Sequence, residues 1–471
     1  MIKSQSPPPY SLSLFSLKKV TLILLIVFYP LALATATPIH DDTTNTPGTT
    51  TRVNLGSQGE QSNHHSMQAV ISSNGRFVAF ATHATNLAPD NNTYSDIYLR
   101  DITLGLTQRI TLAPDGSESN GRSLDPTISA NGRYIAFTSY ATNLVPDDTN
   151  LSRDIFLHDR QTGLTELVSL THTGQQSNNI SMKPSLSSDG RYIVFVSEAT
   201  NLVPNDNNNN QDIFIRDRLQ QTTKRISHND DGVEGNSNSY NPVISANGRY
   251  IIYASSSHNL VPNDTNGVND IFRHDLATNT TILISQNEQG IIGNGHSQYP
   301  DISADGRYIT YYSQATNLVP NDNNQAFDIF WHDTVTNQTV RASRDSNGRE
   351  ANDSSFYQAL SGNGRYITFM SYATNLVPTD TNNGTDIFLF DTHNQQIKLL
   401  SINTAGQQAN NSTAVRQPAI SNNGFYVVFD ADATNLIYDD TNEADDIFYH
   451  NTIHLDQLIH NLYLPFLNTS P

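Results

Sequence analysis

Residues 128–137 read Ile-Ser-Ala-Asn-Gly-Arg-Tyr-Ile-Ala-Phe, and residues 154–159 read Asp-Ile-Phe-Leu-His-Asp. The Asn-Gly pair is a tight-hairpin signal, because both residues tolerate the positive φ of such turns. The triplet Asp-Ile-Phe, once Asp-Ile-Tyr, recurs five times at a spacing of 58 residues and then once at 60, beginning at Asp96, Asp154, Asp212, Asp270, Asp328, Asp386 and Asp446. The hairpin glycine recurs in step at Gly75, Gly132, Gly190, Gly248, Gly306, Gly364 and Gly424. The chain therefore contains seven copies of one unit.

Each unit predicts four short strands, which in the second copy are residues 126–129, 134–138, 154–158 and 165–169. No segment before the C-terminal tail shows sustained helical periodicity. We therefore predict an all-β fold, a seven-bladed β-propeller with four antiparallel strands per blade. The last copy lacks its fourth strand, and residues 51–54 supply an extra strand before the first copy. We expect this N-terminal strand to complete the last blade and close the ring.

Units of this form resemble the TolB-like β-propeller repeats of bacterial exported proteins, which are WD-like propellers. The resemblance covers residues 51 to about 452, and its seven in-phase copies make it specific for the fold. It implies no single function, because the family spans partner-binding, scaffold and enzyme-associated propellers. The family's namesake carries an additional N-terminal domain and fewer blades, so its envelope partners are not implied for this chain.

The N-terminus has the pattern of a secretory signal peptide. Lys18 and Lys19 precede an apolar run, residues 20–34, and Ala34-Thr35-Ala36 has the form of a cleavage site. We predict a signal peptide at 1–36, a flexible linker at 37–50, the propeller at 51–452 and a tail at 453–471 that packs on the hairpin face or serves in surface attachment or export. An uncleaved anchor is the alternative for the leader. The mature chain is expected to be secreted or on the cell surface, monomeric, and without a membrane span.

Composition excludes several classes of function. The 471 residues include 45 acidic and 26 basic side chains, giving a net charge of −19, and no cysteine. The acidic balance argues against nucleic acid or an anionic membrane as a partner. The absence of cysteine excludes disulfides, thiolate zinc sites and a cysteine nucleophile.

The loops predict one decorated face. The connections from strand two to strand three, and from strand four to the next blade, are long and emerge on the same side, whereas the other two connections are tight hairpins. Functional residues are therefore expected on the long-loop face.

An Asp and an Asn lie six and four residues before each triplet Asp. The sets are Asp90/Asn92/Asp96, Asp148/Asn150/Asp154, Asp206/Asn208/Asp212, Asp264/Asn266/Asp270, Asp322/Asn324/Asp328, Asp380/Asn382/Asp386 and Asp440/Asn442/Asp446. Two carboxylates and an amide oxygen suit a hard cation such as Ca²⁺. Asp and Asn also cap turns by bonding their own backbone, so both interpretations stay open. A further recurrent asparagine in the adjoining loop is expected to reach the ion or brace the loop: Asn63, Asn120, Asn178, Asn236, Asn294, Asn352 and Asn410.

Ligand binding requires asymmetry, so we sought positions where the copies differ. The residue after strand two forms a varied polar and aromatic ring, and the candidate ligand-binding residues there are His83, Tyr140, Glu198, Gln314, Tyr372 and Asp432. Such a ring suits a protein or glycan ligand, although it is equally compatible with an unselected surface. The near-uniform blades favour a non-catalytic binding protein. The alternative is an extracellular polysaccharide lyase or hydrolase in which His83, Asp432 and Glu198 face one central opening.

Three other recurrent features are interpreted as structural. The arginine after the hairpin glycine, as in Arg133, is expected to form a salt bridge with a neighbouring blade. The fifth residue of strand three is His or Arg in six copies and Phe390 in the other, which argues against a ring of metal-binding histidines. Trp331 is expected in the core.

Overall fold

Seven antiparallel sheets of four strands each make up the propeller, which confirms the predicted fold class. The computed structural model describes residues 48–89, 91–410 and 418–452. The predicted signal peptide, most of the predicted linker and the predicted tail lie outside these residues. Within them there is no helix, and hence none long and apolar enough to cross a membrane.

The strands are named by their place in each blade. The first strands are β2 (Ser66–Ile71), β6 (Ser123–Ile128), β10 (Ser181–Leu186), β14 (Ser239–Ile244), β18 (Ser297–Ile302), β22 (Ser355–Leu360) and β26 (Ala419–Ile420). The second strands are β3 (Phe77–Thr82), β7 (Tyr134–Ser139), β11 (Tyr192–Ser197), β15 (Tyr250–Ser255), β19 (Tyr308–Ser313), β23 (Tyr366–Ser371) and β27 (Tyr426–Ala431).

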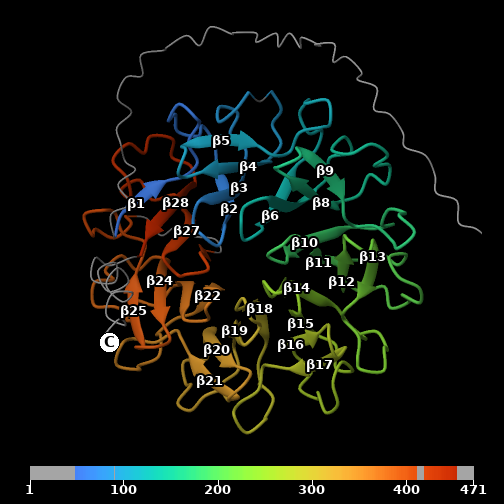
Figure 1. Cartoon of the computed structure of the whole chain (residues 1–471). Coiled ribbons are helices and arrows are strands. Elements are labelled where there is room, and N and C mark those ends of the chain that lie inside the picture. The colour runs from blue at the N-terminus through green and yellow to red at the C-terminus, as the bar shows by residue number, and fades with distance from the viewer. Residues whose placement is uncertain (1–47, 90, 411–417, 453–471) are drawn as a thin grey trace, which may run out of the picture. The chain divides into compact units, whose positions relative to one another are not determined.

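The third strands are β4 (Asp96–Asp101), β8 (Asp154–Asp159), β12 (Asp212–Asp217), β16 (Asp270–Asp275), β20 (Asp328–Asp333), β24 (Asp386–Asp391) and β28 (Asp446–Asn451). The fourth strands are β5 (Leu106–Arg109), β9 (Leu164–Leu167), β13 (Thr222–Arg225), β17 (Thr280–Leu283), β21 (Gln338–Arg341), β25 (Gln396–Leu399) and β1 (Thr50–Arg52). Blades 1 to 6 are consecutive in sequence from β2, and blade 7 consists of β26, β27, β28 and β1. In Figure 1 the sheets surround a common centre, with the first strands innermost.

The N-terminal strand completes the last blade. In β1, Thr51 pairs with Tyr449 and Arg52 with Phe448 of β28, and Figure 1 shows the blue β1 beside the red β28. This confirms the predicted closure. The ring consequently joins residues nearly 400 positions apart and leaves no blade with three strands.

The first strand of blade 2 starts earlier than predicted. In blade 2 it begins at Ser123 rather than at residue 126, and the register against β7 shifts between Leu124 and Thr127. A β-bulge explains the difference, because the inserted residue breaks the two-residue alternation from which a strand is recognised. The bulged residue, Asp125, has a φ of 52°, a conformation that side chains other than glycine seldom adopt.

A cross-strand aromatic pair forms the centre of each blade. In blade 5, Tyr311 of β19 lies opposite Phe330 of β20, both side chains are fully buried, and their ring centroids are 5.9 Å apart. The equivalent pairs are Phe80/Tyr98, Phe137/Phe156, Phe195/Phe214, Tyr253/Phe272, Phe369/Phe388 and Phe429/Phe448. Such pairs combine a large buried apolar area with favourable ring contacts.

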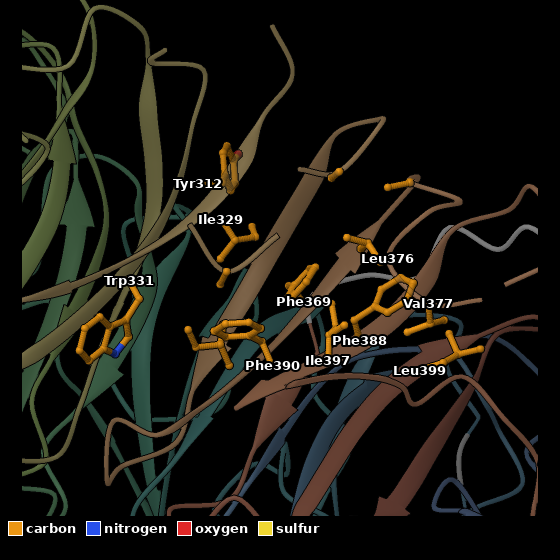
Figure 2. Packing of buried hydrophobic residues seen from close by; sticks show 14 of the residues in the cluster. Tyr312, Ile329, Trp331, Phe369, Leu376, Val377, Phe388, Phe390, Ile397 and Leu399 are labelled. Atoms are coloured by element: carbon orange, nitrogen blue, oxygen red, sulfur yellow. The ribbon is translucent and has the colours of Figure 1, made fainter. Parts of the chain in front are cut away.

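Adjacent blades pack face to face. Figure 2 shows Ile329 and Trp331 of blade 5 facing Phe369 and Phe390 of blade 6 in one buried cluster. Trp331 is 9% exposed and stacks on Tyr308 at 5.0 Å. Its place in the core is therefore as predicted.

The recurrent arginine pairs within its own blade, not with a neighbouring blade as expected. Arg133 donates from Nε and Nη2 to the two carboxylate oxygens of Asp159, at 2.8 and 2.7 Å. The turn that carries the arginine and the end of strand three lie side by side in one sheet, so the nearest carboxylate belongs to the same blade. Blade 7 has Phe425 in place of the arginine and Asn451 in place of the aspartate, so both charges are replaced together.

Candidate functional site

The two long loops of each blade are braced by the recurrent asparagine. In blade 3, Asn178 Nδ2 donates to Thr200 Oγ1 at 3.0 Å, and the backbone amide of Thr200 donates to Asn178 Oδ1 at 3.0 Å. The same contacts recur with Asn120 and Asn352. These asparagines brace the loops, which is one of the two roles expected for them.

The Asp/Asn sets lie at the start of strand three and form hydrogen-bonded turns. In blade 2, Asn150 Nδ2 donates to Asp154 Oδ2 at 2.8 Å, and Asn150 Oδ1 accepts the backbone amide of Ser152 at 2.9 Å. Asp154 is fully buried and accepts hydroxyl bonds from Ser169 and Ser177. The asparagine therefore caps a turn and holds the buried carboxylate. Asp90 of the first set lies outside the described residues.

The same turn forms around the asparagine of every other set. Each Oδ1 atom accepts the backbone amide of the residue two positions later, and the asparagines concerned are Asn92, Asn208, Asn266, Asn324, Asn382 and Asn442. Their Nδ2 groups face the triplet aspartate in five of these sets, namely those of Asn92, Asn208, Asn266, Asn324 and Asn442. In the remaining set, Asn382 Nδ2 donates to the carbonyl oxygen of Ala409 at 3.1 Å.

In this geometry each asparagine oxygen accepts a backbone amide, and in six of the seven sets the amide hydrogens point toward the triplet carboxylate. This is the turn-capping arrangement that was one of the two interpretations of the sets. Asn92, Asn150, Asn208, Asn266, Asn324, Asn382 and Asn442 are therefore turn caps in this structure. Spacing alone did not reveal this, because the same residue type serves both roles. Calcium binding by the aspartates and asparagines of the sets stays a prediction.

The two carboxylates of a set are close enough to affect each other. Burial and the charge of Asp154 raise the pKa of Asp148 to about 6. Burial and the charge of Asp328 do the same for Asp322, whose pKa is also about 6. The described residues include no group of three or more His, Asp or Glu side chains arranged to hold a metal ion. In these two sets the carboxylates of each pair repel each other.

The six predicted ligand-binding residues fall into separate groups around the ring. Tyr140 lies under the guanidinium groups of Arg122 and Arg153, at 5.2 and 5.6 Å from its ring centre. Glu198 accepts a 3.0 Å hydrogen bond from Gln211 within blade 3. Glu198 is thus two blades away from His83 of blade 1 and three from Asp432 of blade 7, and Gln314 of blade 5 is exposed.

An acid–histidine cluster joins blades 7 and 1; it consists of His64, His65, His83, Asp432 and Asp445. His65 Nδ1 lies 3.2 Å from Asp445 Oδ2, and the His64 ring is 5.7 Å from that of His83. Burial and the charge of Asp445 raise the pKa of Asp432, and His65 opposes this effect. The structure therefore brings His83 and Asp432 into one neighbourhood, as their adjacent blades predicted.

The β-bulges line the central channel with a second varied ring, which sequence reasoning missed. The third residue of the first strand has a positive φ in blades 1 to 6; these residues are Gln68, Asp125, Lys183, Asn241, Tyr299 and Tyr357. The channel has a volume of about 320 Å³ and is lined by first-strand residues of all seven blades. Lys183 Nζ lies 2.9 Å from Asp125 Oδ1, and Gln68 Nε2 donates to the same oxygen at 3.0 Å. The sequence signal was present, because this position changes residue type between most copies.

An aromatic wall extends from the channel toward the long loops of blades 5 and 6; it consists of Tyr299, Tyr312, Phe327, Phe356, Tyr357 and Tyr372. Tyr312 stacks on Tyr299 at 5.5 Å with an interplanar angle of 20°. Phe356 meets Tyr312 edge-on at 5.4 Å and Tyr372 at 6.3 Å. Tyr372 is 48% exposed, so the wall ends in a ring that a ligand can contact.

No protein-family model and no curated protein matches this chain. Among solved structures, an oligogalacturonate lyase from Vibrio parahaemolyticus is similar with a TM-score of 0.51 and 11% identity, covering 87% of this chain and 99% of the lyase. An oligogalacturonate lyase in complex with manganese gives a TM-score of 0.52 and 10% identity, over 86% and 98% of the two chains. TolB from Acinetobacter baumannii gives 0.39 and 15% identity, over 71% of this chain and 62% of TolB. The matches to the lyases show a shared propeller fold.

Proposed function

We propose that this chain is an exported, non-catalytic β-propeller of the TolB-like kind that binds a glycan at the long-loop end of its central channel. The aromatic wall of blades 5 and 6 is the observation that carries this proposal. Tyr299 of the wall lines the channel, and Tyr372 at its other end is 48% exposed. Exposed aromatic faces of this kind bind the apolar C–H faces of sugar rings. The leader with Lys18, Lys19 and the apolar run at 20–34 supports export.

Polar partners for sugar hydroxyl groups lie close to the wall. The bulge ring places Lys183, Asp125 and Asn241 in the channel, and these side chains offer both donors and acceptors. Their hydrogen bonds would set the orientation of a ligand whose ring stacks on the aromatic wall. A combination of a stacking surface and a few fixed polar groups is typical of small-molecule sites.

Charge restricts the class of glycan. The net charge of the chain is −19. Two of the acidic residues, Asp432 and Asp445, lie in the acid–histidine cluster at the junction of blades 7 and 1. A polyanionic ligand would be repelled by such a surface, whereas a neutral or amino-substituted glycan would not. We therefore expect a neutral or cationic oligosaccharide.

Calorimetric titration of the secreted chain with neutral, amino-substituted and uronic-acid oligosaccharides tests this function. We expect binding of a neutral or amino sugar, and at least a tenfold loss for Y372A. Y94A is the matched control, because Tyr94 is 45% exposed but lies in the long loop of blade 1. Equal affinities of Y372A and the parent chain, or binding of none of the sugars, would refute the proposal. Binding of a peptide library that depends on Tyr372 would instead identify a protein ligand.

The acid–histidine cluster favours one second candidate, a polysaccharide lyase or hydrolase. His65 is paired with Asp445 at 3.2 Å, and the side chain of His65 is 45% exposed, so a substrate can reach this base. In a lyase reaction the histidine would remove a proton beside the sugar carboxyl group. The glycosidic C–O bond would break, a C=C bond would form, and the leaving oxygen would take up a proton. Product analysis of the same oligosaccharides distinguishes the two functions, because shortened products that disappear in H65A require an enzyme.

A further inference from the structure

The carboxylate pairs of blades 2 to 7 differ in the group that lies between them. In blades 1, 3, 5 and 7 the fourth strand ends in an arginine, namely Arg109, Arg225, Arg341 and Arg52. In blade 5, Arg341 Nη1 lies 3.4 Å from Asp322 Oδ1 and 3.7 Å from Asp328 Oδ2. In blade 7, Arg52 lies 3.3 Å from Asp440 and 2.8 Å from Asp446. The space between the carboxylates thus accepts a positive charge.

Blades 2 and 6 use a neutral donor at the same place. The arginine is replaced by Leu167 and Leu399, and in blade 2 Gln176 Nε2 from the adjoining loop donates to Asp148 Oδ1 at 3.3 Å. In blade 6, Gln408 Nε2 donates to Asp380 Oδ1 at 2.9 Å and to Asp386 Oδ2 at 2.8 Å. The glutamine therefore bridges the pair without neutralising it.

Blade 4 has neither of these groups. Leu283 ends its fourth strand, and Ile292 stands where other blades have glutamate or glutamine. Asp264 is 6% exposed, and its Oδ1 atom is buried with no hydrogen-bond partner in the described part of the chain. Asp264 faces Asp270 closely enough to raise the pKa of that carboxyl group, after the larger effect of burial. The Asp264 carboxylate also accepts a hydrogen bond from the backbone amide of Asn266, but no cationic side chain of the described residues forms an ion pair with it. A buried carboxylate oxygen without a partner, beside a second carboxylate, is costly unless a cation neutralises it.

We propose that blade 4 binds one calcium ion between Asp264 and Asp270, in the place that arginine occupies in blades 3, 5 and 7. Both ligands are carboxylates, and hard oxygen donors in an irregular loop suit calcium. Asp270 Oδ2 already accepts from Asn266 Nδ2 at 2.6 Å, so Asn266 fixes the orientation of this carboxylate and is not itself a ligand. This inference is independent of the proposed glycan binding, since Asp264 and Asp270 belong neither to the aromatic wall nor to the bulge ring that carries Asn241 of blade 4.

Calcium titration of the chelator-treated, full secreted chain tests the site. We expect D264N to bind one calcium ion fewer per chain than the parent, whereas D322N in blade 5 serves as the matched control and leaves the stoichiometry unchanged. A chelator is expected to lower the melting temperature of the parent chain, because an ion that binds only the native state stabilises it. No calcium binding by the parent, or the same stoichiometry in D264N, would overturn the proposal.

A swap between blades separates a cation site from a structural role of Asp264. The variant L283R/I292E copies the Arg341/Glu350 pair of blade 5 while it retains both aspartates. We expect it to fold, to bind one calcium ion fewer and to lose the sensitivity to chelator that depends on blade 4. If it still binds the same number of calcium ions as the parent, the site is not the space between Asp264 and Asp270.

Discussion

The hairpin side of the propeller repeats almost unchanged around the ring, whereas the long-loop side differs from blade to blade. On the hairpin side, six blades carry the same arginine–aspartate pair with an Nη2–Oδ2 distance of 2.7 Å in each. On the long-loop side, one junction between blades carries histidines and acids and another carries aromatic rings. Repetition marks the residues that hold the blades together, and the divergent residues are those to which we assign ligand binding in the proposed function.

The largest expected loss of stability comes from the buried aromatic pairs, which we compare with an exposed ring on the long-loop side. Phe330 is fully buried against Tyr311, so F330A should lower the free energy of unfolding by about 3–5 kcal/mol. Y372A removes a half-exposed ring on the long-loop side and should cost less than about 1 kcal/mol. Urea unfolding measures both values. Similar losses in the two variants would contradict the division into a structural and a recognition surface.

The seven-bladed ring was predictable because its signals repeat. The Asn-Gly hairpins and the Asp-Ile-Phe strands occur in phase, and the strand missing from the last copy is present before the first. The bulges were not predictable in the same way. A residue with a positive φ, such as Asp125, interrupts the two-residue alternation of side chains from which a strand is recognised. The position was nevertheless visible as a residue that varies between copies that otherwise agree.

The candidate site was predictable only in part. His83, Asp432 and Tyr372 were identified from the ring after strand two, but their partners lie on other strands and across blade junctions. His65 meets Asp445 through the closure of blade 7 on blade 1, and Tyr372 meets Phe356 across the sheet of blade 6. Such contacts depend on how strands and blades twist against each other, which spacing along one sequence does not specify.

The buried histidines of strand three provide the second test. They recur at the same place in several blades, whereas blade 6 has Phe390 there. Burial lowers the pKa of His332 to about 4, and its Nδ1 lies 3.0 Å from Thr339 Oγ1. His274 and His450 also have a pKa of about 4. In each case the pKa in the folded protein lies below the unfolded value of roughly 6.5. The stability that comes from keeping these histidines neutral is therefore fully present above that pH. It is lost as the pH falls from about 6.5 toward 4, by up to about 3 kcal/mol per histidine.

The variant H332F/T339I copies the Phe390/Ile397 pair of blade 6 and should flatten this dependence. Thermal unfolding between pH 7 and pH 4 measures it, with H172Q as the control, since His172 is exposed. The parent and H172Q should lose melting temperature equally toward pH 4, and H332F/T339I should lose less. An identical slope for all three chains would show that His332 titrates normally in the folded protein.

The smallest expected effect concerns the hairpin-side ion pairs, for which blade 7 supplies the exception. Arg365 pairs with Asp391 at 2.7 Å, and the arginine side chain is 37% exposed, so solvent screening limits the pair to about 1 kcal/mol or less. R365F alone leaves the buried Asp391 without its cation. R365F/D391N instead reproduces Phe425/Asn451 of blade 7.

Unfolding of both variants should therefore show that the double substitution restores part of the stability lost in R365F. Such a coupling would mean that the two blade 7 residues changed as a unit and that the hairpin side tolerates exchange only of complete pairs. A double variant less stable than R365F would instead show that Phe425 depends on other residues of blade 7. In that case the stability of each hairpin-side pair would depend on the packing of its own blade, and a pair could not be exchanged between blades.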